Sequence, residues 1–582
     1  MTSGDTARVE RRDPIFLNSA VRVGALVIAI SLVGGAHFTL FQVKDQDRPV
    51  LVGLTLLLLL IHFLPPRALA CSARPSRRGL LAMLAIASLS IWGLTYALMR
   101  DFGVSYDEFM VLFDMQVYAG GQLAAPFPAE WRDYTLNLVP SFLLNQIRPE
   151  ALVSTYLPMN AIARLAFSQI LPATLMNPLL FFVGGVALLD IARNQFGEDR
   201  ETILVVFLLY LMSMQAWAAA MTPYAMTAHL ALNLVWLAAF LRGGRWHLLA
   251  IATAAVATGL HQLVFHPLFA APFLLQRLLE RRWRLVALYA GAYAVICAAW
   301  IAFPMLAAAY TGTAAVAGGS HGDFFHDRVL PLLASQNDNA VLLAVLNLAR
   351  FFAWQHLALL PLVTLAILAI RRGEGLSRAL GGGIVLTFVL ITLVLPFQGH
   401  GWGYRYLHGW IGSFAVLAGF GYRELRSRTK DGARTAVTVL TIATVPAMVW
   451  LASRIDAFVG PHVLLEQRIA SSSADMILIE TESATATRDG RWAPNGIDLV
   501  RNRPDLANRP LRLSSQLMTP DLAAGLCRRG SITLLDRDDQ RRVGFAPNQL
   551  GPSMEFRVLR DRMESEARLG RCRIVAFDKV AR

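Results

Sequence analysis

Long apolar stretches recur along the first 454 residues, and they limit the possible folds more strongly than any other feature of the sequence. A helix that crosses a bilayer needs about 20 mostly apolar residues, because the hydrocarbon core is roughly 30 Å thick. Charged residues make up only 16% of the 582 residues, too few to cover a water-soluble globule. We therefore predict an all-α polytopic membrane protein with about 13 transmembrane helices. The stretches lie near 21–41, 49–64, 79–98, 172–192, 202–221, 224–241, 247–260, 264–279, 285–305, 354–370, 379–396, 407–422 and 435–453.

The basic residues are unevenly distributed among the segments between these stretches. If the N-terminus is cytoplasmic, the inner segments hold 24 Lys and Arg, whereas the outer segments before residue 455 hold 10 over about twice the length. Cytoplasmic loops of membrane proteins carry such an excess. The net charge of +14 is then mainly a consequence of topology, and we expect no nucleic-acid partner. An odd number of spans places the C-terminal tail outside the cytoplasm.

Composition changes near Arg454 and marks a domain boundary. About 29% of the residues after 454 are charged, against about 13% before it. Short apolar runs at 476–479 and 532–535 are typical of strands, and they alternate with helical and turn segments. We predict a transmembrane domain over 1–454 and a small soluble α/β domain over 455–582, outside the cytoplasm.

Three outer segments are candidates for function: 99–171, which is the largest, 306–353 and 397–406. In the first, Asp107 and Asp114 are spaced to share one face of a helix that ends at Gly120 or Gly121. Ser105 and Glu108 have the spacing of a capping box, and acids in a first turn complement the helix dipole. Two interpretations remain open, a cap and an active carboxylate, and both can hold.

The residues from Asp107-Glu108 through this helix to the stretch GGQLAAP at 120–126 resemble the first extracytoplasmic loop of the GT-C glycosyltransferases. The similarity is greatest to the branch of lipid A aminoarabinose transferases and protein mannosyltransferases. It extends loosely over 100–420 and includes IARNQFG at 191–197. The chain departs from the family in having two spans before the one that leads into Asp107, where the family often has one.

This resemblance implies a GT-C-like fold in a bacterial inner (plasma) membrane and a glycosyltransferase activity. One sugar would pass from a polyprenyl-phosphate donor to an envelope glycan, lipid or protein on the outer face. Asp107 would be the catalytic base or an acceptor-positioning carboxylate, with Glu108 beside it. A carboxylate suits this work, because the acceptor hydroxyl loses its proton as it attacks and positive charge develops on the sugar. No cofactor is certain. A divalent cation is a candidate, although a second acidic residue of the family is not evident around 221–224.

The short outer loop at 397–408 contains a single Arg, Arg405, among Gly and aromatic residues. Arg binds phosphate with a fork of donors, and Gly allows the backbone to approach a ligand. Related membrane glycosyltransferases have a Gly-x-Arg-Tyr-like element that contacts the donor phosphate. The resemblance therefore implies a donor-phosphate site at Arg405, Tyr404 and His400. The alternative is an interfacial aromatic belt with an anchoring Arg.

Further polar residues are candidates for substrate binding: Asp114, His261 and His266. The two histidines are placed at an outer turn, where a structural role is the alternative. His321, Asp323, His326 and Asp327 form a denser cluster whose residue types suit a divalent ion, and a polar loop is the other interpretation.

Cys527 and Cys572 are the only cysteines in the tail. Because disulfides persist outside the cytoplasm, we predict a bond between them, with two free thiols as the alternative. For the whole protein the alternative functions are a transporter or flippase for lipid-linked glycans, and a glycan polymerase or ligase. A coupled transporter commonly has charged residues within its spans. The predicted spans have almost none.

Overall fold

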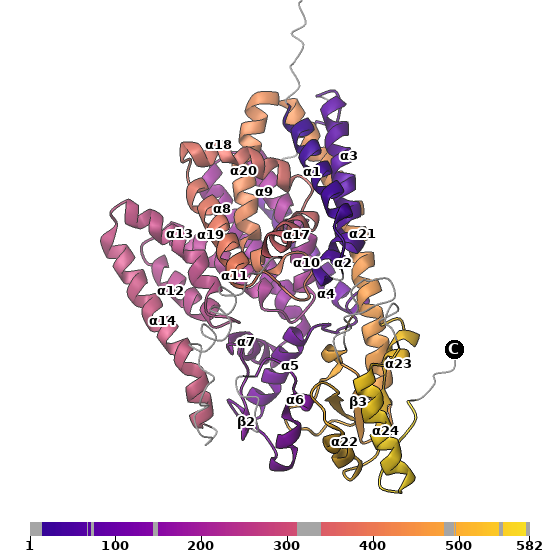
Figure 1. Ribbon diagram of the computed structural model, residues 1–582. Helices are drawn as coiled ribbons and strands as arrows, with labels where there is room; N and C mark the ends of the chain where they lie inside the picture. Colours follow the sequence, from indigo (N-terminus) through magenta and orange to yellow (C-terminus); the bar gives the residue numbers. More distant parts are fainter. Residues whose placement is uncertain are drawn as a thin grey trace, which may run out of the picture.

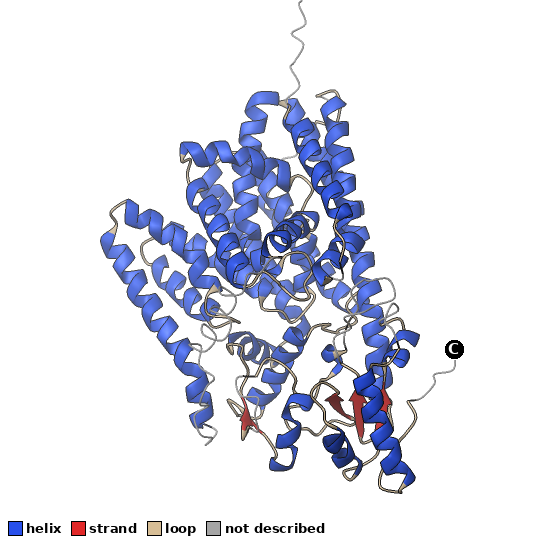
Figure 2. Ribbon diagram, in the orientation of Figure 1, coloured by secondary structure: helices blue, strands red, loops and turns tan. Residues whose placement is uncertain are grey.

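Helices dominate the computed structural model, and a small α/β domain lies at one end of the helical bundle (Figures 1 and 2). The structure describes residues 14–577 apart from 36, 67, 71–74, 144–148, 311–338, 482–493, 495 and 546–550. The bundle contains α1 (Ile15–Leu32), α2 (Phe38–Gln42), α3 (Arg48–Phe63), α4 (Arg77–Ala97), α8 (Met176–Phe196), α9 (Arg200–Leu211), α10 (Met214–Ala220), α11 (Met226–Arg242), α12 (Trp246–Thr258), α13 (Phe265–Leu279), α14 (Trp283–Tyr310), α17 (Ala340–Ala353), α18 (Leu359–Arg372), α19 (Ser377–Val394), α20 (Ile411–Thr429) and α21 (Asp431–Ala470).

Each of the predicted apolar stretches coincides with one or more of these helices, which confirms a polytopic, mostly helical membrane protein. By length and composition, seven helical segments of the described residues are long and apolar enough to cross a membrane. The bent pair α9 and α10, which meet at 49°, would make an eighth. The predicted count of about 13 spans is not confirmed, because helices such as α11 and α12 are shorter than a bilayer requires.

Two segments predicted to lie in outer loops are helical and buried instead. Residues 340–353 form α17, and Arg350 on this helix is fully buried. Residues 43–47 are a π-helical turn that joins α2 to α3 without a loop, so Asp47 lies inside a candidate span over 38–63. The prediction of loops at these positions is wrong. Apolar contacts on one face of α17 keep it in the bundle despite its single internal charge.

Ion pairs join the predicted cytoplasmic segments at the end of the bundle opposite the α/β domain (Figure 1). Arg426, at the end of α20, pairs with Asp199, and Arg434, at the start of α21, pairs with Glu201 at 2.9 Å. The order of the predicted spans and the excess of Lys and Arg place segments 193–201 and 423–434 on the same side of the membrane. Their contact is consistent with that assignment.

The C-terminal domain is built on a parallel three-stranded sheet of order β4-β3-β5. Its strands are β3 (Met476–Ile479), β4 (Leu511–Ser514) and β5 (Ile532–Leu535), and its helices are α22 (Pro520–Cys527), α23 (Arg537–Arg542) and α24 (Met554–Arg568). The strands predicted at 476–479 and 532–535 are therefore confirmed. After α24 the chain adds only a single parallel bridge to the sheet, between Ile574 and Ile532. Helix α21 crosses the predicted domain boundary at Arg454 without a break and ends at Ala470.

The first outer segment folds against this domain, beyond the same end of the bundle (Figure 1). It contains α5 (Tyr106–Ala119), α6 (Thr135–Leu138), α7 (Met159–Ser168) and the short strands β1 (Ala125–Pro126) and β2 (Ala151–Leu152). One hydrophobic core includes side chains of both parts, among them Met110, Phe113 and Leu138 of the segment and Leu513, Leu526 and Phe556 of the domain.

Candidate functional site

Helix α5 begins with a complete capping box. The Ser105 side chain accepts a hydrogen bond from the Glu108 backbone N–H at 3.3 Å, and Glu108 Oε2 accepts one from the Ser105 N–H at 2.9 Å. Glu108 is fully buried, and this burial raises the pKa of its carboxyl to about 7 despite the hydrogen bonds that the Ser105 N–H and hydroxyl donate to that carboxyl. The geometry therefore uses Glu108 as a cap, whereas Asp107, one residue earlier, points elsewhere.

Asp107 makes contacts with two side chains that are distant in sequence. Its Oδ1 accepts a hydrogen bond from the Tyr156 hydroxyl, and its Oδ2 forms an ion pair with Arg405 Nη1. Burial would raise the pKa of the Asp107 carboxyl, but the positive charge of Arg405 and the hydrogen bonds outweigh it, so the pKa lies below its ordinary value. Asp107 is thus ionised near neutral pH, the state that a general base requires.

Arg405 is presented by a loop whose backbone is held at several points. Gln398 bonds across the loop, accepting from the Arg405 N–H at 2.9 Å and donating to the Gly403 carbonyl at 3.0 Å. Gln215, on α10, donates to the Tyr404 carbonyl at 2.8 Å. Gly403 adopts φ 72°, and a Cβ there would lie 2.4 Å from Gln215 Oε1, so this position requires glycine. The loop is therefore a fixed support for the guanidinium.

The other predicted phosphate ligands of this loop are placed differently. The His400 ring stacks on Phe458 at 5.0 Å, and burial lowers the pKa of His400 well below its ordinary value, so the ring is neutral. Tyr404 is buried beside Tyr406, with ring centroids 5.9 Å apart. Neither lines the cavity beside Arg405. Both act in the packing of the loop.

His261 completes the surroundings of Asp107. Its ring stacks on that of Tyr156 with centroids 4.2 Å apart, and burial lowers the pKa of His261 to about 4. The Tyr224 hydroxyl lies 2.5 Å from Ser105 Oγ. Sequence reasoning missed both tyrosines, because no motif distinguishes Tyr156 or Tyr224 from other aromatic residues of the chain.

Arg405 and His261 line a cavity that extends toward α11, α13 and α19. Its empty volume is about 590 Å³, which includes space that is open to solvent. Aromatic rings form much of its wall, and the buried side chains of His229, His408 and Thr387 have polar atoms without a hydrogen-bond partner among the described residues. Arg405 Nε is likewise buried without a partner there. The complete lining is Tyr224, Ala225, Met226, His229, Asn233, His261, Phe265, Thr387, Arg405, Tyr406, His408, Gly409 and Trp410.

Two further candidate residues lie outside this constellation. His266 is fully buried between Asn233, at 2.8 Å, and the Tyr293 hydroxyl, at 3.1 Å, which is a structural role. Asp114 is buried on α5, where burial raises the pKa of its carboxyl to about 8 against a hydrogen bond from Ser154. A carboxyl that is largely protonated at neutral pH is a poor cation ligand or base.

The residues around Asp107 do not fit a divalent cation. They offer one carboxylate, and its two oxygens are bonded to Tyr156 and to the cationic Arg405. Such ions prefer several oxygen ligands. Among the described residues no three His, Cys, Asp or Glu side chains group as a metal site. The cluster of His321, Asp323, His326 and Asp327 lies outside the described residues.

This chain is similar to several solved structures. Two of them are ArnT from Cupriavidus metallidurans in the apo state, with a TM-score of 0.47, and the same protein bound to undecaprenyl phosphate, with a TM-score of 0.48. Sequence identity is 13% in both cases, and the alignment covers 82% of this chain and 90% of the other. No protein-family model matches the sequence, and no curated protein matches it either.

A buried polar network behind Arg405 was not predicted. Arg350 of α17 pairs with Asp47 at 3.2 Å, and both side chains are fully buried. The guanidinium also donates to the Gly401 carbonyl at 2.8 Å, which ties α17 to the loop of Arg405. Trp354 donates to the other oxygen of Asp47 at 2.6 Å. The sequence predicts loops at both positions, so it does not reveal that the two charges pair.

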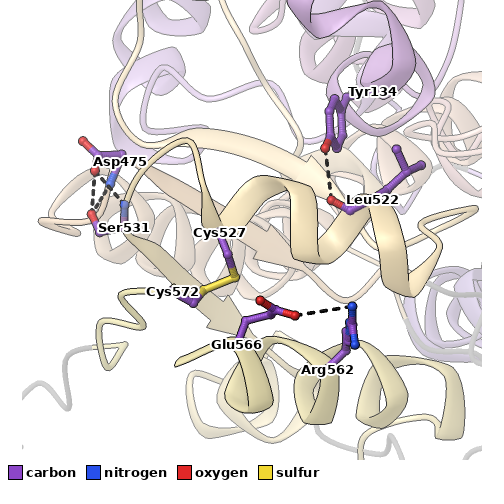
Figure 3. Close-up of a disulfide and its surroundings, with 8 residues drawn as sticks. All are labelled: Tyr134, Asp475, Leu522, Cys527, Ser531, Arg562, Glu566 and Cys572. Atoms are coloured by element: carbon purple, nitrogen blue, oxygen red, sulfur yellow. Dashed lines mark hydrogen bonds and ion pairs between the residues drawn. A yellow bond between two sulfur atoms is a disulfide. The ribbon is translucent and has the colours of Figure 1, made fainter. Parts of the chain in front are cut away.

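In the C-terminal domain Cys527 and Cys572 are joined by a disulfide, which links the end of α22 to the segment after α24 (Figure 3). The Cα atoms are 4.5 Å apart.

Proposed function

We propose that this chain is an integral membrane glycosyltransferase that moves a single sugar from a polyprenyl-phosphate-linked donor to an acceptor on the outer face of a bacterial inner membrane. The acceptor classes are envelope glycan, lipid and protein. One observation carries the proposal: the carboxylate of Asp107 pairs with the guanidinium of Arg405, and Arg405 lines a cavity bordered by helices of the bundle. The two groups come from motifs whose family counterparts handle the acceptor and the donor phosphate.

The chemistry assigned to this pair is a single inverting displacement. The Asp107 carboxylate takes the proton of the acceptor hydroxyl as its oxygen forms a bond to the anomeric carbon. The bond from that carbon to the phosphate oxygen breaks, and the phosphate leaves with both electrons. Arg405 stabilises the leaving phosphate with its fork of donors, including the Nε–H that has no partner among the described residues. No covalent intermediate on the protein is required.

The cavity beside Arg405 suits an amphipathic donor. Aromatic rings of Phe265, Tyr406 and Trp410 offer apolar surface, and Arg405 lies among them as the group that meets a phosphate. A pocket with apolar walls and a few polar groups is the usual form of a small-molecule site.

The role of Asp107 is tested by Asp107→Asn, which retains size but removes the base. We expect the transfer rate to fall by about 10²–10⁴-fold if general-base catalysis is lost. The assay follows labelled sugar from a lipid-linked donor into envelope acceptors of membranes that express each variant. Asp505→Asn, an exposed carboxylate of the C-terminal domain, is the control and is expected to be fully active. A well-folded Asp107→Asn protein with normal turnover would refute the assignment.

The role of Arg405 is tested with undecaprenyl phosphate as the probe. Arg405→Lys retains the charge but not the bidentate fork, so the affinity for this lipid should fall, and Arg405→Ala should weaken it further. Unchanged affinity in both variants would favour the aromatic-belt interpretation of the loop.

The proposed orientation has the N-terminus in the cytoplasm and the C-terminal domain outside. It rests on the excess of Lys and Arg in the inner segments. A periplasm-dependent reporter fused after Arg582 should be active, and a cytoplasm-dependent one should be silent. The opposite pattern would reverse the side on which Asp107 acts.

A further inference from the structure

The C-terminal domain reaches the first turn of α5, the helix that carries Asp107. Asp498 lies in a short 3-10 helix, Ile497–Leu499, and its Oδ1 accepts a hydrogen bond from the Tyr106 backbone N–H at 2.6 Å. Tyr106 is the residue immediately before Asp107. The first N–H groups of a helix have no partner within the helix, and a carboxylate there also complements the helix dipole. Ser105 caps one of these groups locally, and Asp498 caps another from a different domain.

A second side chain of the same segment, Arg501, contacts aromatic residues at the start of α5. The Arg501 guanidinium lies 4.3 Å from the centre of the Phe102 ring and 6.0 Å from that of Phe109. Arg501 Nε also donates to the Asp498 carbonyl at 2.6 Å, which couples the two residues. The aromatic rings stand before and after the first turn, so the contact holds the turn from both sides.

Other hydrogen bonds also join the two parts. Asn137 of α6 donates to the Ser514 carbonyl at 2.9 Å, and Asn502 donates to the Leu138 carbonyl at 2.8 Å. The Tyr134 hydroxyl donates to the Leu522 carbonyl at 3.0 Å (Figure 3). Together with the shared hydrophobic core, these bonds attach the C-terminal domain to the outer segment.

We propose that Asp498 is a positioning residue that sets the direction of Asp107 through the first turn of α5, so that the C-terminal domain is a structural part of the catalytic site. The inference rests on the proposed function of Asp107. Its physical reason is that the Asp107 side chain leaves the backbone one residue after the bonded N–H. A rotation of this turn would move the carboxylate away from Arg405 and from the acceptor. Misplacement of a reacting group by about 1 Å can cost about 100-fold in rate.

The kinetic test compares Asp498→Ala, Asp498→Asn and the control Asp505→Ala in the full chain. The Asn amide oxygen can still accept from the Tyr106 N–H, whereas Ala cannot. We expect kcat for sugar transfer to fall by about 10- to 100-fold in Asp498→Ala, to recover largely in Asp498→Asn, and to stay at the wild-type value in Asp505→Ala. Affinity for undecaprenyl phosphate should be unchanged in all three. Wild-type kcat in Asp498→Ala, or an equal loss of kcat and lipid affinity, would overturn the proposal.

Hydrogen exchange tests the contact without reference to activity. Amides 105–109 should exchange faster in Asp498→Ala than in the wild type, while those of α18 should not change. Unaltered exchange at 105–109 would overturn the positioning role even if transfer activity is present. If exchange accelerates in Asp498→Ala but neither the wild type nor any variant transfers sugar, the contact is supported and the proposed function is refuted.

Discussion

At the scale of single residues, the bundle contains a buried ion pair, Arg350 with Asp47. Both groups are fully buried, and their remaining donors and acceptors are used by Gln42, Trp354 and the Gly401 carbonyl. Removing two charges from water is costly, and a buried pair repays that cost only when its geometry satisfies both partners. Because these donors and acceptors are bonded within the protein, the pair has a structural role. It holds the loop that presents Arg405.

Arg350→Met tests this role. It leaves Asp47 as an unpaired buried charge, so the free energy of unfolding should fall by about 3–5 kcal/mol. Thermal unfolding in detergent measures the change. Arg372→Met, which removes an exposed ion pair with Glu424, is the control and should leave stability close to that of the wild type. A loss in Arg350→Met no greater than in the control would show that the pair is dispensable.

Asp114 permits a prediction about pH. The pKa of its carboxyl is about 8 in the folded protein because of burial, against about 3.9 in an unfolded chain. The folded state therefore binds the proton more tightly. The stabilising contribution is complete below about pH 4 and is lost as the pH rises through 8. In Asp114→Asn the melting temperature should fall less between pH 5 and 8 than in the wild type. Parallel profiles would contradict the raised pKa.

At the scale of elements, α5 depends on its N-terminal cap for its position. Ser105 bonds to Glu108 and lies within 2.5 Å of the Tyr224 hydroxyl, just before α11 begins. The cap therefore anchors α5 to the bundle as well as closing its first turn. Helix α21 connects the bundle to the C-terminal domain, because it runs from one to the other without a break.

Ser105→Ala should cost about 1 kcal/mol of stability, the usual effect of losing a side-chain cap. Transfer activity should change far less than in Asp107→Asn, because the carboxylate is retained. Ser105→Thr keeps the hydroxyl and is expected to restore stability. A loss of activity in Ser105→Ala as large as that in Asp107→Asn would mean that the cap takes part in the chemistry.

At the scale of the whole molecule, the C-terminal domain is stabilised by the bond between Cys527 and Cys572, which are 45 residues apart. In the loop-entropy model a closed loop of this length contributes about 4 kcal/mol. Cys527→Ser combined with Cys572→Ser should lower the stability of the domain by that order. Because the domain shares a core with the outer segment, α5 should also exchange its amides faster.

Mass spectrometry of non-reduced peptides from native membranes provides the direct measurement. A linked pair of peptides that contain Cys527 and Cys572 is expected. Two free thiols would remove the disulfide and would also weaken the outward placement of the domain, because the extracytoplasmic compartment is the one in which disulfides persist.

Local patterns determined much of this protein. Runs of apolar residues are a property of neighbouring positions, so they located the membrane helices, and the change in charge content located the C-terminal α/β domain. The capping box at Ser105 and Glu108 could also be predicted, because all of its atoms lie within one helical turn. The motifs around Asp107 and Arg405 could each be recognised in the sequence, because each is a short run of neighbouring residues.

Only the tertiary structure decided how these parts meet. Asp107 and Arg405 are 298 residues apart, Asp47 and Arg350 are 303, and Tyr106 and Asp498 are 392. The stability of a charge in a buried place depends on its partner, and no local pattern reveals a partner at such separations. The sequence therefore placed Asp47 and Arg350 in loops, where an unpaired charge is tolerated. The folded bundle buries them, because each supplies the charge and hydrogen bonds that the other requires.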